Sequence, residues 1–108
     1  MFLHGWGADQ RVFAPAFSFL KDHTVTTVDL YGFGETPAPT IPVDLDYYVQ
    51  GVKRLMAYYN MENVLVVGHS FGGRVAVKLA QSSRVAGVVL VDAAEPPFTG
   101  SFNFLPIL

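Results

Sequence analysis

The chain has no cysteine and little charge. Its 108 residues contain no Cys, which excludes disulfides and thiolate metal sites. Only 15% of the residues are charged, the net charge is −2, and Lys and Arg form no cluster, so the chain lacks the electrostatic signature of a nucleic-acid-binding protein. No apolar run approaches the roughly 20 residues of a membrane-spanning helix, and residues 1–3 do not resemble a signal peptide. We therefore expect a cytoplasmic protein without nucleic-acid or membrane partners.

Hydrophobic periodicity predicts strands that alternate with helices. Residues 64–67 and 85–91 are continuous apolar runs, which are typical of parallel sheets covered on both faces. Together with the helices this predicts an α/β fold, a three-layer sandwich whose parallel sheet has about four strands. Strands are expected at residues 1–3, 24–30, 64–67 and 85–91, and helices at residues 9–20, 44–60 and 71–81.

Residues 68–72 read Gly-His-Ser-Phe-Gly, between a predicted strand and a predicted helix. This is the G-x-S-x-G nucleophile elbow in its expected setting, and it makes Ser70 a candidate nucleophile. Gly68 and Gly72 provide the small residues that a sharp strand-to-helix turn requires. The alternative is a glycine-rich turn in which Ser70 caps the following helix, as in a phosphate-binding loop.

A second loop supplies what an acyl-transfer reaction needs besides a nucleophile. The oxyanion of a tetrahedral intermediate requires two N–H donors. Phe71, directly after the serine, offers one. Residues 4–7 read His-Gly-Trp-Gly after the first predicted strand, and the glycines permit a reversal that directs the Trp6 N–H inward.

Four segments in order, 2–9, 29–36, 67–73 and 89–92, resemble successive landmarks of the α/β-hydrolase superfamily. The resemblance is to the branch of small esterases and carbon–carbon-bond hydrolases whose oxyanion loop reads HGWG. It covers only the N-terminal half of such enzymes, an incomplete core over residues 1–97, and implies that residues 98–108 begin a lid or form a disordered tail. The predicted strands would be the third to sixth of an eight-stranded sheet.

The resemblance implies roles for eight residues and no cofactor or metal. Ser70 would be the nucleophile, and the Trp6 and Phe71 amides would form the oxyanion hole. His4 would organise its own loop. The other positions that support the loop and the elbow are Gly5, Gly68, His69 and Gly72.

No histidine follows Ser70, although relatives take their acid and their histidine from later in the chain. His23 precedes a strand and is expected at the opposite edge of the sheet. Asp92 and Glu95 are candidates for the acid because some relatives carry it after the sixth strand, but a turn or capping role is favoured for Asp92. Whether Tyr31 and Phe33 line a pocket stays open.

The resemblance also predicts the arrangement of the layers. The strand order would be 24–30, 1–3, 64–67 and 85–91, with helix 9–20 on one face and the other two helices on the opposite face. The last of these strands would leave a bare sheet edge, which invites association with another chain.

We expect a serine hydrolase that acts on a small-molecule ester or a related acyl or carbonyl substrate. The chain alone should be inactive, because a triad without its base retains only binding and oxyanion effects. The alternative is a catalytically dead α/β-hydrolase-like module that binds a small molecule or a partner.

Overall fold

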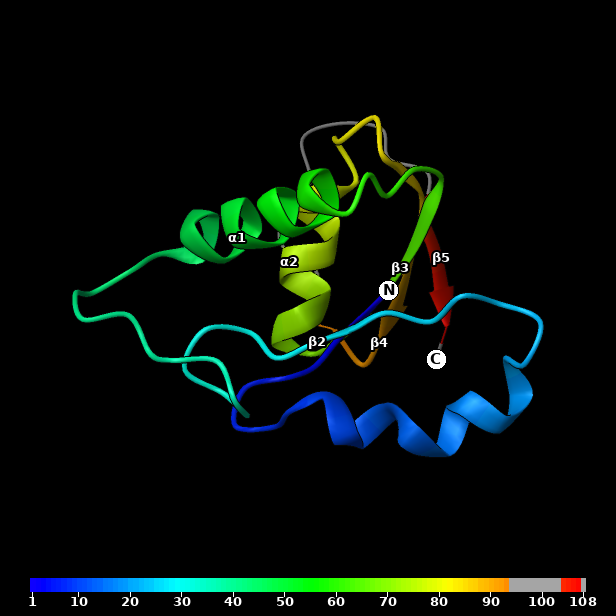
Figure 1. Cartoon of the computed structure of the whole chain (residues 1–108), viewed down its shortest axis with the longest axis horizontal. Helices are drawn as coiled ribbons and strands as arrows, with labels where there is room; N and C mark the ends of the chain where they lie inside the picture. Colours follow the sequence, from blue (N-terminus) through cyan, green and yellow to red (C-terminus); the bar gives the residue numbers. More distant parts are fainter. Residues whose placement is uncertain (94–103, 108) are drawn as a thin grey trace.

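The computed structural model describes residues 1–93 and 104–107. Within these ranges, five parallel strands form one sheet in the order β2-β1-β3-β4-β5 (Figure 1). The predicted order of the first four strands is therefore confirmed. The strands are β1 (Phe2–Leu3), β2 (Thr27–Val28), β3 (Val64–His69), β4 (Val85–Val91) and β5 (Phe104–Ile107).

Helices flank the sheet, as the α/β prediction requires. Helices α1 (Leu45–Tyr58) and α2 (Phe71–Leu79) pack against one another, and α2 packs on β1, β3 and β4. The 3-10 helix η1 (Gln10–Phe19) instead contacts β1 and β2. Figure 1 shows η1, in blue, well away from α1 and α2.

The two side chains of β1 show that these helices cover opposite faces. Successive side chains of a strand point to opposite faces of the sheet. Leu3 is fully buried in the main hydrophobic cluster, to which α1 and α2 also contribute. The ring of Phe2 packs against Phe13 and Phe17 of η1, at centroid distances of 4.9 and 6.2 Å. The predicted three-layer arrangement is thus confirmed.

Helix α1 follows from its sequence at both ends. Asp44 is the N-cap, and its carboxylate accepts a hydrogen bond from the Tyr47 N–H at 3.0 Å, which satisfies a donor that the helix itself leaves unpaired. Asn60, just past the helix, has the positive φ of 49° that is typical of a helix C-terminus. The apolar stripe between these ends is the buried face of the helix: Tyr48, Val49, Val52 and Met56.

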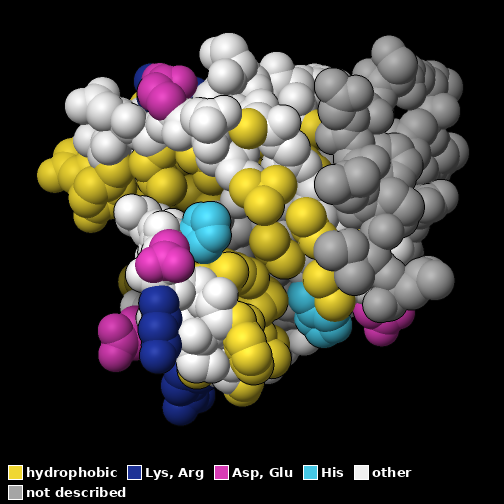
Figure 2. Space-filling model, turned by 90° about the vertical axis from the view of Figure 1, so that its right-hand side faces the viewer, with side chains coloured by type: hydrophobic (Ala, Val, Ile, Leu, Met, Phe, Trp, Pro, Cys, Tyr) yellow, Lys and Arg dark blue, Asp and Glu magenta, His cyan; other side chains and the backbone are white. Residues whose placement is uncertain are grey.

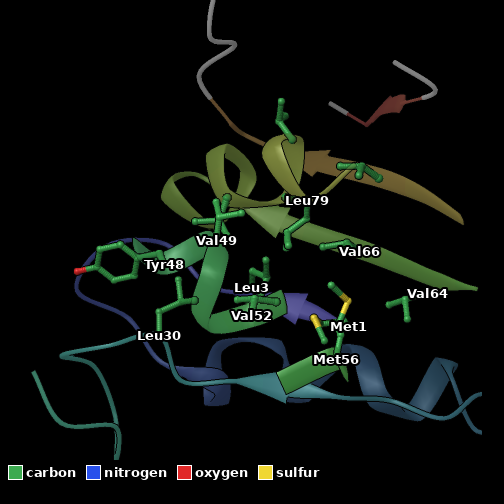
Figure 3. Packing of buried hydrophobic residues seen from close by; sticks show 14 of the residues in the cluster. Met1, Leu3, Leu30, Tyr48, Val49, Val52, Met56, Val64, Val66 and Leu79 are labelled. Carbon is green, nitrogen blue, oxygen red and sulfur yellow. The ribbon is translucent and has the colours of Figure 1, made fainter. Parts of the chain in front are cut away.

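The core lies between this face of α1, helix α2 and the sheet. Figure 3 shows side chains from β1, β3 and the helices meeting there. The fully buried members come from every one of these elements, so a single cluster fixes the helices to the sheet. Those with the largest side chains are Leu3, Met56, Leu79, Val66, Val75 and Val88.

Two elements differ in detail from the prediction. The helix at residues 10–19 is a 3-10 helix and not an α-helix, and none of its residues is buried. Pro15 explains part of this, because it has no N–H to donate to Arg11 in an α-helical pattern. Strand β2 is also shorter than the predicted 24–30, since its partner β1 offers only two residues for pairing.

Strand β5 was not expected. The prediction that the strand at 85–91 forms the bare edge of the sheet is wrong, because β5 pairs with β4 from Val88↔Phe104 to Val91↔Ile107. The lid or tail expected at residues 98–108 falls mostly outside the described residues. Whether the chain associates through a sheet edge stays a prediction.

The sheet is incompletely covered on the η1 side. An open cavity of about 470 Å³ lies against the amino-terminal part of β3, and Leu65 of β3 is 51% exposed. Figure 2 shows hydrophobic side chains gathered in the middle of one side of the molecule. Within the described part of the chain, no helix is both long and apolar enough to cross a membrane.

The core predicts a contrast between two substitutions on α1. Met56→Ala should lower the free energy of unfolding by about 2–5 kcal/mol, because Met56 is fully buried and the surroundings cannot fill the space it leaves. Tyr58→Ala should change it by less than about 0.5 kcal/mol, because Tyr58 is 78% exposed. Urea denaturation followed by circular dichroism measures both. Equal losses would contradict the assignment of the core.

Candidate active site

Ser70 has an unusual backbone conformation at the junction of β3 and α2. Its φ is 49° and its ψ is −114°, values that are strained for a residue with a Cβ atom. The residue is exposed. Although Ser70 occupies the N-cap position of α2, its side chain makes no capping hydrogen bond. The capping bond that the alternative requires is therefore absent, and no described residue is hydrogen-bonded to the hydroxyl at the carboxyl end of the sheet.

Hydrogen bonds on both sides hold this strained residue in place. The Ser70 N–H donates to the Val91 carbonyl of β4 at 3.1 Å. The Ser70 carbonyl accepts from the Gly73 N–H at 2.9 Å, at the start of α2. The surrounding structure thus determines the conformation of Ser70.

The glycines of the elbow allow backbone segments to approach closely. A Cβ atom on Gly68 would lie 2.5 Å from the Gly72 carbonyl oxygen, closer than real Cβ atoms come to another atom. A Cβ atom on Gly72 would overlap the Leu3 and His4 carbonyls at the end of β1. Gly68 and Gly72 therefore let α2 begin directly above the end of β1, and their part in a nucleophile elbow stays a prediction.

The loop after β1 lies against the elbow. Residues 5–8 form a turn closed by the Ala8 N–H and the Gly5 carbonyl at 3.2 Å, with Gly7 at a φ of 77°. A Cβ atom on Gly5 would lie 3.2 Å from the Ser70 Cβ and 3.0 Å from the His69 Nδ1. The structure thus brings together residues that are 65 positions apart in the sequence, 70 minus 5.

Aromatic rings connect this loop to its neighbours. Trp6 is 67% exposed. Its ring packs edge-to-face on the Phe71 ring, with the centroids 5.2 Å apart. It also packs on Phe33 at 4.9 Å, and Phe33 in turn packs on the buried His4 ring at 5.4 Å. Phe33 therefore lies beside the Trp6 loop. Tyr31 packs on Tyr47 and Tyr48 of α1, at 5.0 and 6.2 Å, and lines a separate cavity of about 130 Å³.

The two candidate oxyanion donors lie on these adjacent segments. Phe71 is the first residue of α2, so the helix offers no acceptor for its N–H, and the helix N-terminus carries partial positive charge. Trp6 is the second residue of the turn at 5–8, which is closed by a different N–H. Among the described residues, neither of these N–H groups donates a hydrogen bond to a backbone carbonyl.

His4 is fully buried, and both of its ring nitrogens are engaged. Nε2 accepts a hydrogen bond from the Leu30 N–H at 3.0 Å, so Nδ1 carries the proton and donates to the Gly5 carbonyl at 2.7 Å. This ring therefore connects the loop to Leu30, just after β2. It has no free nitrogen with which to deprotonate Ser70.

Within residues 1–93, no histidine or acidic side chain is hydrogen-bonded to the Ser70 hydroxyl. His69 packs against Gly5, and its buried Nδ1 has no hydrogen-bond partner. His23 lines the cavity beside the start of β3, at the other end of the strands, as predicted. Asp92 is exposed with a φ of 46°, which fits a turn residue, and Glu95 lies outside the described residues. The described ranges contain no group of His, Cys, Asp or Glu that suits a metal ion.

Comparison with known proteins identifies relatives along the whole chain. The model of the alpha/beta hydrolase family matches residues 1–108. The AB hydrolase superfamily protein YisY of Bacillus subtilis is 30% identical over 104 residues, which cover 92% of this chain and 39% of the relative. Lipase LipV of Mycobacterium tuberculosis is 34% identical over 94 residues, 85% of this chain and 36% of the lipase.

A solved structure agrees with these relatives. An esterase from Exiguobacterium antarcticum superimposes with a TM-score of 0.80 at 30% identity, covering 93% of this chain and 39% of that one. The chain thus spans little more than a third of the length of these proteins.

The strain at Ser70 predicts that two substitutions differ in stability. Ser70→Gly should be more stable than Ser70→Ala by about 1 kcal/mol, because glycine adopts this conformation without strain whereas alanine keeps the Cβ atom. Neither variant has a hydroxyl, so the comparison isolates the backbone. Thermal or urea unfolding measures the difference. An alanine variant as stable as the glycine variant would show that the turn is unstrained.

Proposed function

The chain belongs to the alpha/beta hydrolase family, and on that premise we propose that Ser70 is the nucleophile of a serine hydrolase. The observation that carries the proposal is the strained, exposed Ser70 between β3 and α2. A serine in such a turn points its hydroxyl out of the sheet, where a substrate reaches it. The strain is consistent with a functional site, because residues held in rarely populated backbone conformations cluster at active sites.

In the proposed reaction the Ser70 Oγ attacks the carbonyl carbon of an ester or a related acyl or carbonyl substrate. The oxygen of that carbonyl becomes negatively charged and accepts hydrogen bonds from the Trp6 and Phe71 N–H groups. The positive end of α2 adds to this stabilisation. The leaving group departs with a proton, and water then releases the acyl group from Ser70. This chemistry requires no cofactor or metal.

The proposed reaction also needs a general base, and the described residues around Ser70 do not supply one. No histidine follows Ser70 in the 108 residues, and His4 has no free nitrogen. We infer that residues 1–97 are the N-terminal part of a hydrolase core and that residues 98–108 lead into a lid. The late Asp and His would then belong to the part of the relatives that this chain does not span.

The similarity to a lipase and to an esterase supports a small-molecule ester as substrate. A cytoplasmic location stays a prediction from the sequence. The second candidate function is a catalytically inactive module that binds a small molecule or a partner. Binding of this kind needs no general base, and the reactivity of Ser70 distinguishes the module from the enzyme.

The chain alone should hydrolyse p-nitrophenyl acetate no faster than its Ser70→Ala variant, because neither protein has a base for the serine. The absorbance of the released p-nitrophenolate measures this. Turnover by the unchanged chain that disappears in Ser70→Ala would contradict the prediction and would place a working base within these residues.

A fluorophosphonate should modify Ser70 in preference to other serines, and added imidazole should accelerate the reaction by serving as the missing base. Mass spectrometry of peptides identifies the modified residue. The adduct should be absent from Ser70→Ala and unchanged in Ser83→Ala, a matched control at an exposed serine. Equal, slow modification of both serines would reject the hydrolase and favour the inactive module.

A further inference from the structure

Asp29, directly after β2, accepts hydrogen bonds from two separate loops. Its Oδ1 accepts the backbone N–H of Gln10 at 2.8 Å. Its Oδ2 accepts the Gln10 Nε2 at 3.3 Å and the backbone N–H of Glu35 at 3.1 Å. Gln10 begins η1 shortly after the Trp6 turn, and Glu35 belongs to the loop that carries Phe33. One carboxylate therefore bonds both to the start of η1, which follows the Trp6 turn in the sequence, and to the loop whose Phe33 ring packs on Trp6.

The loop at residues 31–36 is built to receive this carboxylate. Gly34 has a φ of 54°, and a Cβ atom at this position would overlap the carboxylate of Asp29. The loop is closed by hydrogen bonds from the Phe33 N–H to the Leu30 carbonyl and from the Thr36 N–H to the Phe33 carbonyl, both at 3.0 Å. Because the loop is fixed in this way, the position of Glu35 also determines that of Phe33.

Phe33 in turn restrains Trp6, because the two rings pack edge-to-face with their centroids 4.9 Å apart. Gln10 restrains the same turn from the other side, through the backbone that follows Ala8. Besides the His4 ring and the packing of Trp6 on Phe71, two restraints on the Trp6 turn therefore end at the Asp29 carboxylate. No other acidic side chain described in the structure bonds to both of these loops.

We propose that Asp29 is a positioning residue: its ionised carboxylate holds the Trp6 turn in the place where the Trp6 N–H can serve Ser70. The structural part of this inference concerns the order of the turn. Its catalytic meaning rests on the function proposed above for Ser70 and Trp6.

The electrostatic surroundings allow the carboxylate to stay ionised. Asp29 shares a cavity of about 290 Å³ with the charged groups of Asp9, Arg11 and Glu35. Arg11 is paired with Asp9 at 2.6 Å. Partial burial raises the pKa of Asp29, but the hydrogen bonds from the Gln10 and Glu35 N–H groups outweigh it, so the pKa is lowered overall. The hold on the turn is therefore complete above the ordinary carboxyl pKa and is lost as the pH falls through the lower pKa of the folded chain.

The experiment uses nuclear magnetic resonance on the unchanged chain and two variants. Asp29→Asn keeps the shape of the side chain but leaves one acceptor oxygen for three donors. Glu35→Gln is the matched control, because it removes a negative charge from the same cavity and keeps the Glu35 N–H bond. In Asp29→Asn the order parameter of the Trp6 backbone amide should fall from ~0.85 to below ~0.6. In Glu35→Gln it should stay at the value of the unchanged chain.

A pH titration of the unchanged chain needs no variant and covers the case in which Asp29→Asn does not fold. The amide protons of Gln10 and Glu35 should shift together with a single midpoint below the usual range for Asp, because both bond to one carboxylate. Separate midpoints, or no shift, would overturn the proposal. An ordered Trp6 amide in a folded Asp29→Asn variant would overturn it as well.

Fluorophosphonate labelling tests the role of Asp29 and the reactivity of Ser70 separately. Slower labelling of Ser70 in Asp29→Asn than in Glu35→Gln would support both. If Ser70 is unreactive in the unchanged chain while the Trp6 amide still loses order in Asp29→Asn, the proposed function fails and the role of Asp29 in the turn stands. If labelling is specific to Ser70 but Asp29→Asn leaves its rate unchanged, the catalytic part of the inference fails and the hydrolase stands.

Discussion

The close approach of α2 to the end of β1 is the constraint on which the candidate site depends. A side chain on Gly72 would collide with the Leu3 and His4 carbonyls, and one on Gly68 would collide with the Gly72 backbone. With these glycines the helix begins directly at the edge of the sheet, and Ser70 is forced into its strained turn. The same approach brings Gly5 against Ser70, so a single packing relation joins the serine to the tryptophan loop.

Much of the fold could be predicted from the sequence because its signals are local. The apolar run at 85–91 coincides with β4, and Asp44 caps α1 as its position before the apolar stripe indicates. The exposed turn at Ser70 also follows from the G-x-S-x-G pattern in its setting. The strand order, in contrast, came from the resemblance to a family, since periodicity does not say which strands pair.

The features that were missed depend on contacts between distant segments. The sequence does not say whether Phe33 lines a pocket, and only the structure shows its ring between those of His4 and Trp6. Asp29 bonds to Gln10, which precedes it in the sequence, and to Glu35, which follows it. No motif with a fixed residue spacing predicts such a pair of bonds. The 3-10 geometry of η1 and the pairing of β5 are likewise set by the surroundings of these segments more than by their own residues.

The position of β1 has a consequence for how the chain acquires its fold. This strand has only two residues, yet it lies in the sheet between β2 and β3, where Phe2 pairs with both Thr27 and Val67. During translation Phe2 is synthesised long before Val67. Until β3 has been made, β1 can therefore pair with β2 only. Closing such long loops is entropically costly and slows folding. We therefore expect chaperones to shield the hydrophobic segments of this protein until β3 has been synthesised.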